Sequence, residues 1–441
     1  MALIKKELEI TKLKDLLDIN LALPSYQRPY RWSVKSCNTL FVDTYKAFKD
    51  GVSECRLGSV ILHKEESGKY NIVDGQQRLT TLSILLYCLG DDSKGLLQEK
   101  YSVLSKNYIA TNYGVLKKRI NELNDDESKR YYDYLLTHCM VVKIVTDSEQ
   151  EAFQFFDSQN SRGKELAPHD LLKSYHLREM NHEDESQKIA IINKWENMKQ
   201  DNLVDLFKYY LYPLTQWYKG EEGLGYSSSK IDSFKGIKRA NIFNYAIYHK
   251  ASNLYVEQFN ANGSNELITS EFLNQFQLTQ PVIAGKRFFS YTLTYSILLE
   301  KSKDKIKRFA GFHALDNQVD KLIPNERSGD KYILQLYECS LLFFTDRFGF
   351  DSLTDSVMQQ LYTWSYSLRL TMKAVYPQSI NKYAKGQHER VNVGIAMFRL
   401  VSEMKDPEEL KLLVFEKPDF VVDDEKYKAI RELLCKWNGW K

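Results

Sequence analysis

The sequence lacks the features that mark several large protein classes. Its six cysteines are scattered without a CxxC pair, which argues against a zinc ribbon and against a secreted disulfide scaffold. It has neither a signal-peptide core at its start nor a run of about 18 apolar residues, the length that a membrane span needs. The GxxxxGK[ST] and GxSxG patterns are also missing, which sets aside a classical P-loop NTPase and an α/β-hydrolase. These absences predict a cytoplasmic protein with reduced thiols and no membrane association.

Charge and histidine give little further guidance to function. The excess of Lys and Arg over Asp and Glu is 61 − 58 = +3, so a nucleic-acid surface would have to arise from local clustering. The eight histidines are dispersed and contain no HExxH pair, the spacing of a common zinc site. With 43% hydrophobic and 27% charged residues in 441, the chain is long enough for two folded domains.

Periodicity predicts an α+β domain followed by a mainly helical one. Leucine and isoleucine spacing predicts a short helix over 8–17 and another over 40–48. Two strand-like runs, 56–64 and 69–75, are joined by turn residues and predict a hairpin that leads directly into a helix from Gln76. Beyond residue 100 the strand signal fades. We therefore predict an α+β domain over 1–185 and a helical domain over 186–441.

The most informative stretch is IVDGQQRLTTL, where the second hairpin strand passes into its helix. A helix start offers unpaired backbone N–H groups and a positive dipole end, both of which favour a phosphate. Arg78 is a cation in the first helical turns, where the dipole disfavours it unless an anion compensates. Thr80 and Thr81 add neutral donors. The alternative is simple capping, because Asp74 and Gln77 have the spacing of a capping box.

Two further segments carry candidate binding residues. In the extended segment PSYQRPYRW, Tyr26 and Arg28 share one face while Gln27 lies on the other, and a ring beside a guanidinium suits a nucleotide. The alternative is an edge strand with packed aromatics. In the polar loop SQNSRGK, Asn160 and Arg162 are candidates for binding, while Asp170 can cap the following helix.

Basic and aromatic residues interleave over 301–313 and 362–390 in the C-terminal half. Such clusters bind nucleic acid by releasing counterions and by stacking on bases. Solvated helix faces are the alternative, and the high aromatic count, 29 Tyr and 22 Phe, fits cores as well as stacking.

Four motifs in order carry a family resemblance: LPSYQRPYRW, LGSVIL, YNIVDGQQRLTTLSILL and FQFFDSQNSRGKELAPHDLLKSY. Together they resemble the N-terminal domain of the GmrSD-type restriction endonucleases over about the first 180 residues. The resemblance implies a ParB/sulfiredoxin-like fold and binding and hydrolysis of a nucleoside triphosphate at DGQQR. It also implies an antiviral defence role acting on phage DNA, often modified DNA.

The resemblance also implies roles for individual residues. Asp74 would position a metal ion, with Mg²⁺ expected, or a water molecule. Gln76 and Gln77 would orient the attacking water, and Arg78 would hold phosphate. The nucleotide would be bound by Tyr26, Gln27, Arg28, Gly75, Thr80, Thr81, Asn160 and Arg162. These roles fit phosphoryl transfer, in which positioning and charge stabilisation supply most of the rate.

The sequence departs from the family in its C-terminal half. Full-length members carry an HNH-type nuclease domain, whereas the nearest candidate in residues 200–441 is His388, for which an isolated surface histidine is the alternative. DNA cutting is therefore assigned to a partner, an HNH-type nuclease or another defence subunit, and homo-oligomers are left open. Two alternatives to an NTPase remain: a non-catalytic DNA-binding or protein-interaction module of the same fold, and a stand-alone DNA nuclease.

Overall fold

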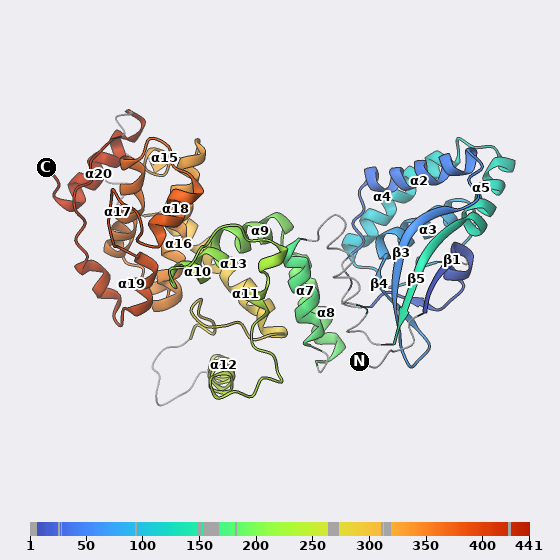
Figure 1. The fold of residues 1–441 in the computed structure, drawn as a ribbon, viewed down its shortest axis with the longest axis horizontal. Helices are drawn as coiled ribbons and strands as arrows, with labels where there is room; N and C mark the ends of the chain where they lie inside the picture. Colours follow the sequence, from blue (N-terminus) through green and yellow to red (C-terminus); the bar gives the residue numbers. More distant parts are fainter. Residues whose placement is uncertain are drawn as a thin grey trace. The chain divides into compact units, whose positions relative to one another are not determined.

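The chain folds into two units that interleave along the sequence (Figure 1). The first unit lies within residues 1–166 and 183–196, and the second within 167–182 and 197–441. This computed structural model describes residues 7–24, 27, 29–92, 95–147, 152, 167–180, 183–262, 273–309, 312, 319–421 and 425–441. The α+β class with a mainly helical second part is confirmed.

The first unit is built on a five-stranded mixed sheet. Its elements are β1 (Glu7–Lys12), α1 (Leu13–Leu17), β2 (Leu21–Ala22), α2 (Val34–Lys49), β3 (Cys55–Lys64), β4 (Tyr70–Asp74), α3 (Gln76–Cys88), α4 (Val103–Ile120), α5 (Asp125–His138), β5 (Cys139–Thr146) and α8 (Glu185–Glu196). The strand order is β1-β5-β3-β4-β2. The β1–β5 and β3–β4 pairs are antiparallel, and the β3–β5 and β2–β4 pairs are parallel. The hairpin predicted over 56–75 is therefore the centre of the sheet.

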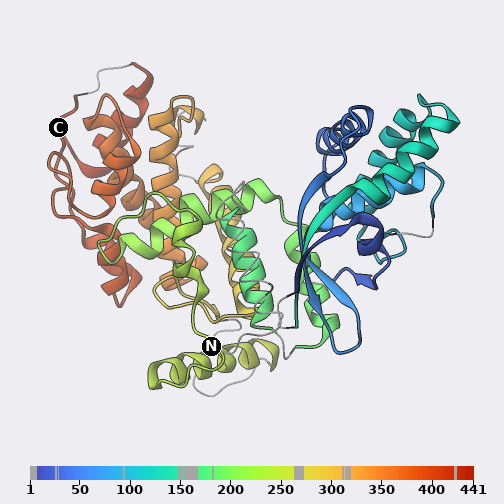
Figure 2. The same cartoon turned by 45° about the vertical axis from the view of Figure 1, so that its right-hand side comes forward.

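One face of the sheet is covered by helices α1 to α5 (Figures 1 and 2). Alternate strand residues such as Val60, Leu62 and Ile72 point into this core, as the two-residue period of a strand requires. Ile61 and Val73 point to the opposite face, where they form a smaller cluster with Ala152. Because α3 follows β4 directly and is buried along most of its length, the β4–α3 turn is fixed on both sides.

Two sequence predictions about strands were wrong. The helix expected over 8–17 is a strand, β1, followed by a one-turn helix, α1. Leu8 and Ile10 are more than half exposed, so backbone pairing with β5 rather than burial holds this segment. The fading of strand signal after residue 100 was also misleading, because β5 pairs with both β1 and β3. It follows α5 without an intervening turn, so no local breaker announced it.

The second unit is helical. Its elements are α7 (Pro168–Arg178), α9 (Gln200–Asp205), the π-helix η1 (Leu206–Leu211), α10 (Tyr212–Trp217), η2 (Ser228–Lys230), α11 (Asp232–Lys235), α12 (Asn244–Asn262), α13 (Lys286–Lys307), α15 (Val319–Leu322), α16 (Ser328–Phe348), η3 (Phe350–Ser352), α17 (Asp355–Thr371), α18 (Pro377–Ala384), α19 (Met397–Glu403), η4 (Pro407–Leu412), η5 (Glu425–Tyr427) and α20 (Lys428–Asn438). Helices α16 and α17 pack together at its centre. None of the helices in the described ranges combines the length and apolar character needed to cross a bilayer.

Aromatic side chains fill the core of the second unit. Trp364, Tyr362 and Tyr366 on α17 are completely or almost completely buried, and the rings of Tyr362 and Tyr366 stack with centroids 4.1 Å apart. Arg369 on the same helix is buried in an ion pair with Asp330, with Nε 2.8 Å from the carboxylate oxygen. The α17 part of the basic and aromatic stretch over 362–390 is therefore core, and these residues are not available to bases or phosphates.

Candidate functional site

The β4–α3 turn is closed by Gly75. Its φ of 98° places it in the left-handed region, which glycine adopts without steric cost. A Cβ at this position would lie 3.0 Å from the Val60 side chain, so close packing against β3 also requires glycine. Gly75 is the N-cap of α3, so Asp74 and Gln77 do not occupy the N-cap and N3 positions of a capping box. The capping-box alternative for Asp74 and Gln77 is therefore wrong.

Arg78 lies half-buried between the first turn of α3 and strand β3. Its Nη1 donates a hydrogen bond to the Ser59 carbonyl oxygen at 3.0 Å, and a Cβ on Gly58 would lie 3.2 Å from the guanidinium. Gly58 has a φ of 97° and occupies an irregularity in the β3–β5 register between Arg56 and Ser59. Such a bulge turns the backbone locally, and here the Ser59 carbonyl meets the guanidinium.

The electrostatic environment of Arg78 is mixed. Burial lowers the pKa of its guanidinium because water is removed from the charge, and the nearby Asp74 carboxylate raises it. Within the described residues Arg78 forms a hydrogen bond to a neutral carbonyl and no ion pair. A partly desolvated cation with this environment gains from an added anion, because its attraction to a charge is stronger than it would be in water.

Gln27 ties the segment before α2 to the end of β4. Its Nε2 donates to the carbonyl oxygens of Ile72 and Val73, at 2.7 Å each. These are the two residues before Asp74, so the segment that carries the PSYQR motif is bonded to the strand that leads into the DGQQR motif. The structure thus brings Gln27 together with the β4–α3 turn, as expected for one site. Tyr26 and Arg28 lie outside the described residues.

Gln77 is committed to the backbone of the same segment. Its side-chain oxygen accepts a hydrogen bond from the Arg31 N–H at 2.8 Å, and its Nε2 donates to the Pro29 carbonyl at 3.1 Å. Both polar ends of the amide are therefore used in holding residues 29–31 against α3. This is a positioning role that the motif alone did not indicate, because the partners lie more than 40 residues earlier in the chain.

The remaining α3 candidates face inward. Gln76 is buried beside Gln77, whose amide donates to it at 3.4 Å. The Thr80 hydroxyl lies 3.3 Å from the Tyr101 hydroxyl, and the Thr81 hydroxyl lies 2.8 Å from the Tyr30 hydroxyl. Both threonines are almost completely buried, because this turn of α3 packs into the core. Their hydroxyls are not available to a phosphate in this structure.

The PSYQRPYRW segment continues into an ion pair with α8. Arg31 Nη2 lies 2.7 Å from a Glu196 carboxylate oxygen and also donates to the Glu196 backbone carbonyl at 3.2 Å. Tyr30 is buried and bonded to Asn112 at 2.8 Å, and burial raises its pKa to about 12. Tyr30 and Arg31 therefore fix this segment in place rather than forming a stacking surface.

The metal ligand predicted at the turn is Asp74, the last residue of β4. Within the part of the chain that the structure describes, no group of three or more His, Cys, Asp or Glu side chains could hold a metal. A carboxylate is a hard oxygen ligand, and Mg²⁺ is commonly held by one or two carboxylates together with substrate phosphates. Asn160 and Arg162 lie outside the described residues.

The histidine expected to be isolated on the surface is buried. His388 packs with its ring edge-on to Tyr383, centroids 5.7 Å apart, and its Nδ1 accepts a hydrogen bond from the Arg390 N–H at 3.3 Å. Burial lowers its pKa. The helix cap expected from Asp170 is also absent, because α7 begins at Pro168 with Ala167 as its N-cap and Asp170 in its first turn.

The fold and the turn define the class of the first unit. Residues 10–177 match the family described as GmrSD restriction endonuclease, N-terminal domain, which confirms the resemblance seen in the four motifs. The chain is thus a restriction-system component that acts on DNA.

The second unit defines the family to which the whole chain is assigned. Residues 187–429 match a family of unknown function (DUF7834). Because this match covers more than half of the 441 residues, the chain belongs to that family. No curated protein matches the chain.

Sequence reasoning missed the β3 side of the site. Gly58 and the Ser59 carbonyl position Arg78, yet the motif LGSVIL was used only as a mark of family. A glycine inside a strand pattern is a known sign of a bulge or of a close approach. That signal was present in the sequence and would have placed a neighbour against Gly58.

Proposed function

We propose that the chain binds and hydrolyses a nucleoside triphosphate at the β4–α3 turn, as part of a restriction system in which a separate nuclease cuts DNA. The proposal is carried by one observation: the half-buried Arg78 guanidinium, held by the Ser59 carbonyl at 3.0 Å next to Gly58. This cation stands at a helix start, where N–H groups favour an anion. The family match to residues 10–177 supports a role in restriction.

Each residue at the turn would have a separate role in hydrolysis. Arg78 binds a phosphate oxygen and stabilises the charge that develops on it during transfer. Asp74, the last residue of β4, orients the attacking water or a metal ligand. A bound Mg²⁺ supplies charge neutralisation on the phosphates. Gln27 and Gln77 position the PSYQR segment through the bonds to β4 and to residues 29–31.

Phosphate release from each of the four nucleoside triphosphates with Mg²⁺ tests this proposal. Arg78→Ala and Asp74→Ala should each lower the rate by roughly 100- to 1,000-fold, the usual effect of removing a preorganised charged group. Arg130→Ala is the matched control, because Arg130 is 64% exposed and, among the residues that the structure describes, its ion pair is with Asp126 on its own helix. Folding of every variant is checked by circular dichroism.

The outcomes separate the proposal from its alternatives. Hydrolysis at the wild-type rate in folded Arg78→Ala would remove the β4–α3 turn from the chemistry. Absence of turnover together with DNA binding would identify a non-catalytic module. Cleavage of plasmid DNA by the chain alone with Mg²⁺ or Mn²⁺ would identify a stand-alone nuclease and dispense with a partner.

A further inference from the structure

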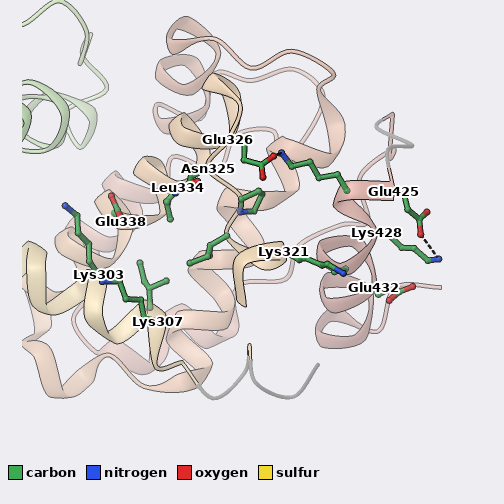
Figure 3. A pocket seen from close by; sticks show the side chains of 15 residues that line it. Lys303, Lys307, Lys321, Asn325, Glu326, Leu334, Glu338, Glu425, Lys428 and Glu432 are labelled. Atoms are coloured by element: carbon green, nitrogen blue, oxygen red, sulfur yellow. Dashed lines mark hydrogen bonds and ion pairs between the residues drawn. The ribbon is translucent and has the colours of Figure 1, made fainter. Parts of the chain in front are cut away.

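A hollow of about 980 Å³ lies within the second unit. On one side it is lined by Lys303 and Lys307 of α13 and Glu338 of α16, and on the other by Lys428 and Glu432 of α20 (Figure 3). Its volume is at the upper end of the range of small-molecule pockets, about 300–1,000 Å³. The hollow therefore has the size of a site for a ligand such as a nucleotide.

One wall of the hollow is fixed by a buried polar network. Asp330 at the start of α16 binds Arg369 Nε at 2.8 Å, the Tyr427 hydroxyl at 2.8 Å and Lys426 Nζ at 3.2 Å. Lys426 also pairs with Glu326 at 2.9 Å. Because the Asp330 side chain is fully buried, this network holds η5 and α20 against α16. This network is formed without a ligand, and the Lys426 ammonium already pairs with two carboxylates, those of Glu326 and Asp330.

Three other lysines of the lining, Lys303, Lys307 and Lys321, are not held in a buried network of this kind. Lys303 and Lys307 lie one helical turn apart on α13, and in the described part of the chain each forms an ion pair with an exposed acid three residues before it, Glu300 at 3.2 Å and Asp304 at 3.3 Å. Exposed ion pairs of this kind contribute little to stability, so they yield readily to a stronger partner. Within the described residues Lys321 of α15 forms no ion pair. All three line the same hollow.

A carboxylate lies beside these lysines. The Tyr210 hydroxyl donates to Glu338 Oε2 at 2.6 Å, and Lys303 Nζ lies 5.4 Å from the centroid of the Tyr210 ring. Burial raises the pKa of Glu338, while Lys303 and Lys307 lower it. Glu338 can accept a hydrogen bond from a ligand through its second oxygen, for which the described residues provide no partner.

We propose that this hollow binds a small phosphate-bearing ligand of nucleotide size, with its phosphate held by Lys303 and Lys307 of α13 and with Lys321 on the opposite side of the ligand (Figure 3). A long nucleic acid fits less well, because Glu326 and Glu425 on the lining are 81% and 83% exposed and would repel a phosphate backbone. This site lies in the second unit and does not depend on hydrolysis at the β4–α3 turn.

The test uses the full chain carrying Arg78→Ala, so that anion binding at the β4–α3 turn is weakened. Inorganic pyrophosphate and AMP are titrated by calorimetry. Both should bind saturably, and Lys307→Glu with Lys321→Glu should weaken both by at least about tenfold, since a hydrogen bond to a charged group corresponds to about that factor. The control is Lys301→Glu with Lys305→Glu, the same charge change at two lysines of α13 that do not line this hollow.

Glu338→Gln adds a second measurement. It removes a negative charge beside the lysines, so pyrophosphate should bind more tightly. Failure of both probes to bind saturably overturns the proposal, as does equal loss of binding in the control variant. A third measurement adds duplex DNA to the AMP complex, at a DNA phosphate concentration equal to that of AMP. If the DNA displaces AMP and binds at least as tightly, the proposal is overturned, because the ligand would then be a nucleic acid. If Arg78→Ala abolishes hydrolysis but still binds AMP, the hollow in the second unit is a different site from the β4–α3 turn.

Discussion

Removing the Gln77 amide should release residues 29–31 from α3. Gln77→Ala deletes the bonds to the Arg31 N–H at 2.8 Å and to the Pro29 carbonyl at 3.1 Å. An unsatisfied buried backbone group costs about 1–3 kcal/mol, and these groups are only partly buried, so we expect about 2–4 kcal/mol of local destabilisation. At about 1.4 kcal/mol per tenfold, amide exchange over residues 30–32 should become roughly 30- to 1,000-fold faster.

Hydrogen–deuterium exchange with mass spectrometry measures this directly. Gln76→Ala is the control, because Gln76 is buried next to Gln77 but forms no bond to residues 29–31 in the described structure. Unchanged exchange over residues 30–32 in Gln77→Ala would refute the positioning role. Gln77→Glu separates positioning from chemistry, since it keeps an acceptor for Arg31. Hydrolysis lost in this variant with exchange unchanged would assign Gln77 to the attacking water, as the family resemblance implies.

Two further predictions follow from the same structure. Gly58→Ala should lower the free energy of unfolding by about 1–2 kcal/mol because of its positive φ, and it should also slow hydrolysis, because the new Cβ lies 3.2 Å from the Arg78 guanidinium. The control is Gly68→Ala, which also has a positive φ but whose Cβ meets nothing within 4 Å, so it should lose stability and keep its hydrolysis rate. Unfolding and hydrolysis are measured for both variants, and equal hydrolysis rates would contradict the prediction. Burial lowers the pKa of His176 to about 3 from 6.5. The neutral imidazole therefore stabilises the fold above pH 6.5, and this stability is lost as the pH falls toward 3, by at most about 1.4 kcal/mol per pH unit. In urea unfolding from pH 7 to pH 4, the free energy of unfolding of His176→Gln should fall less steeply than that of the wild type, and an equally steep fall would argue against a neutral buried imidazole.

The central hairpin and its helix were predictable because their signals are local. The β3–β4 turn is closed by hydrogen bonds between Glu65 and Gly68 and between Glu65 and Lys69, and the apolar residues around it follow the strand period. Helix α3 begins at Gln76, where the helical spacing begins. Local propensity and tertiary structure agree in this region, so a pattern of about 30 residues was sufficient.

The edge and central strands that the sequence did not reveal depend on distant partners. Strand β5 pairs in parallel with β3, more than 80 residues earlier in the chain, and antiparallel with β1 at the start. Pairing across such separations leaves no turn signal in the sequence. In the second unit, the residues of α17 that were considered for nucleic-acid contact are buried instead, because aromatic composition alone does not distinguish a core from a stacking surface.

Contacts between segments far apart in the sequence also explain why only the DGQQR side of the site could be predicted. The motif DGQQR shows a cation, Arg78, at a helix start, but the role of that cation depends on the groups that contact it. Its guanidinium is bonded to the Ser59 carbonyl beside Gly58, while the nearby Asp74 carboxylate acts on it electrostatically. Gly58 and Ser59 come from a bulge in β3 about 20 residues before the motif. The phosphate contact proposed for Arg78 therefore depends on a backbone irregularity in a neighbouring strand, which the motif DGQQR by itself does not show.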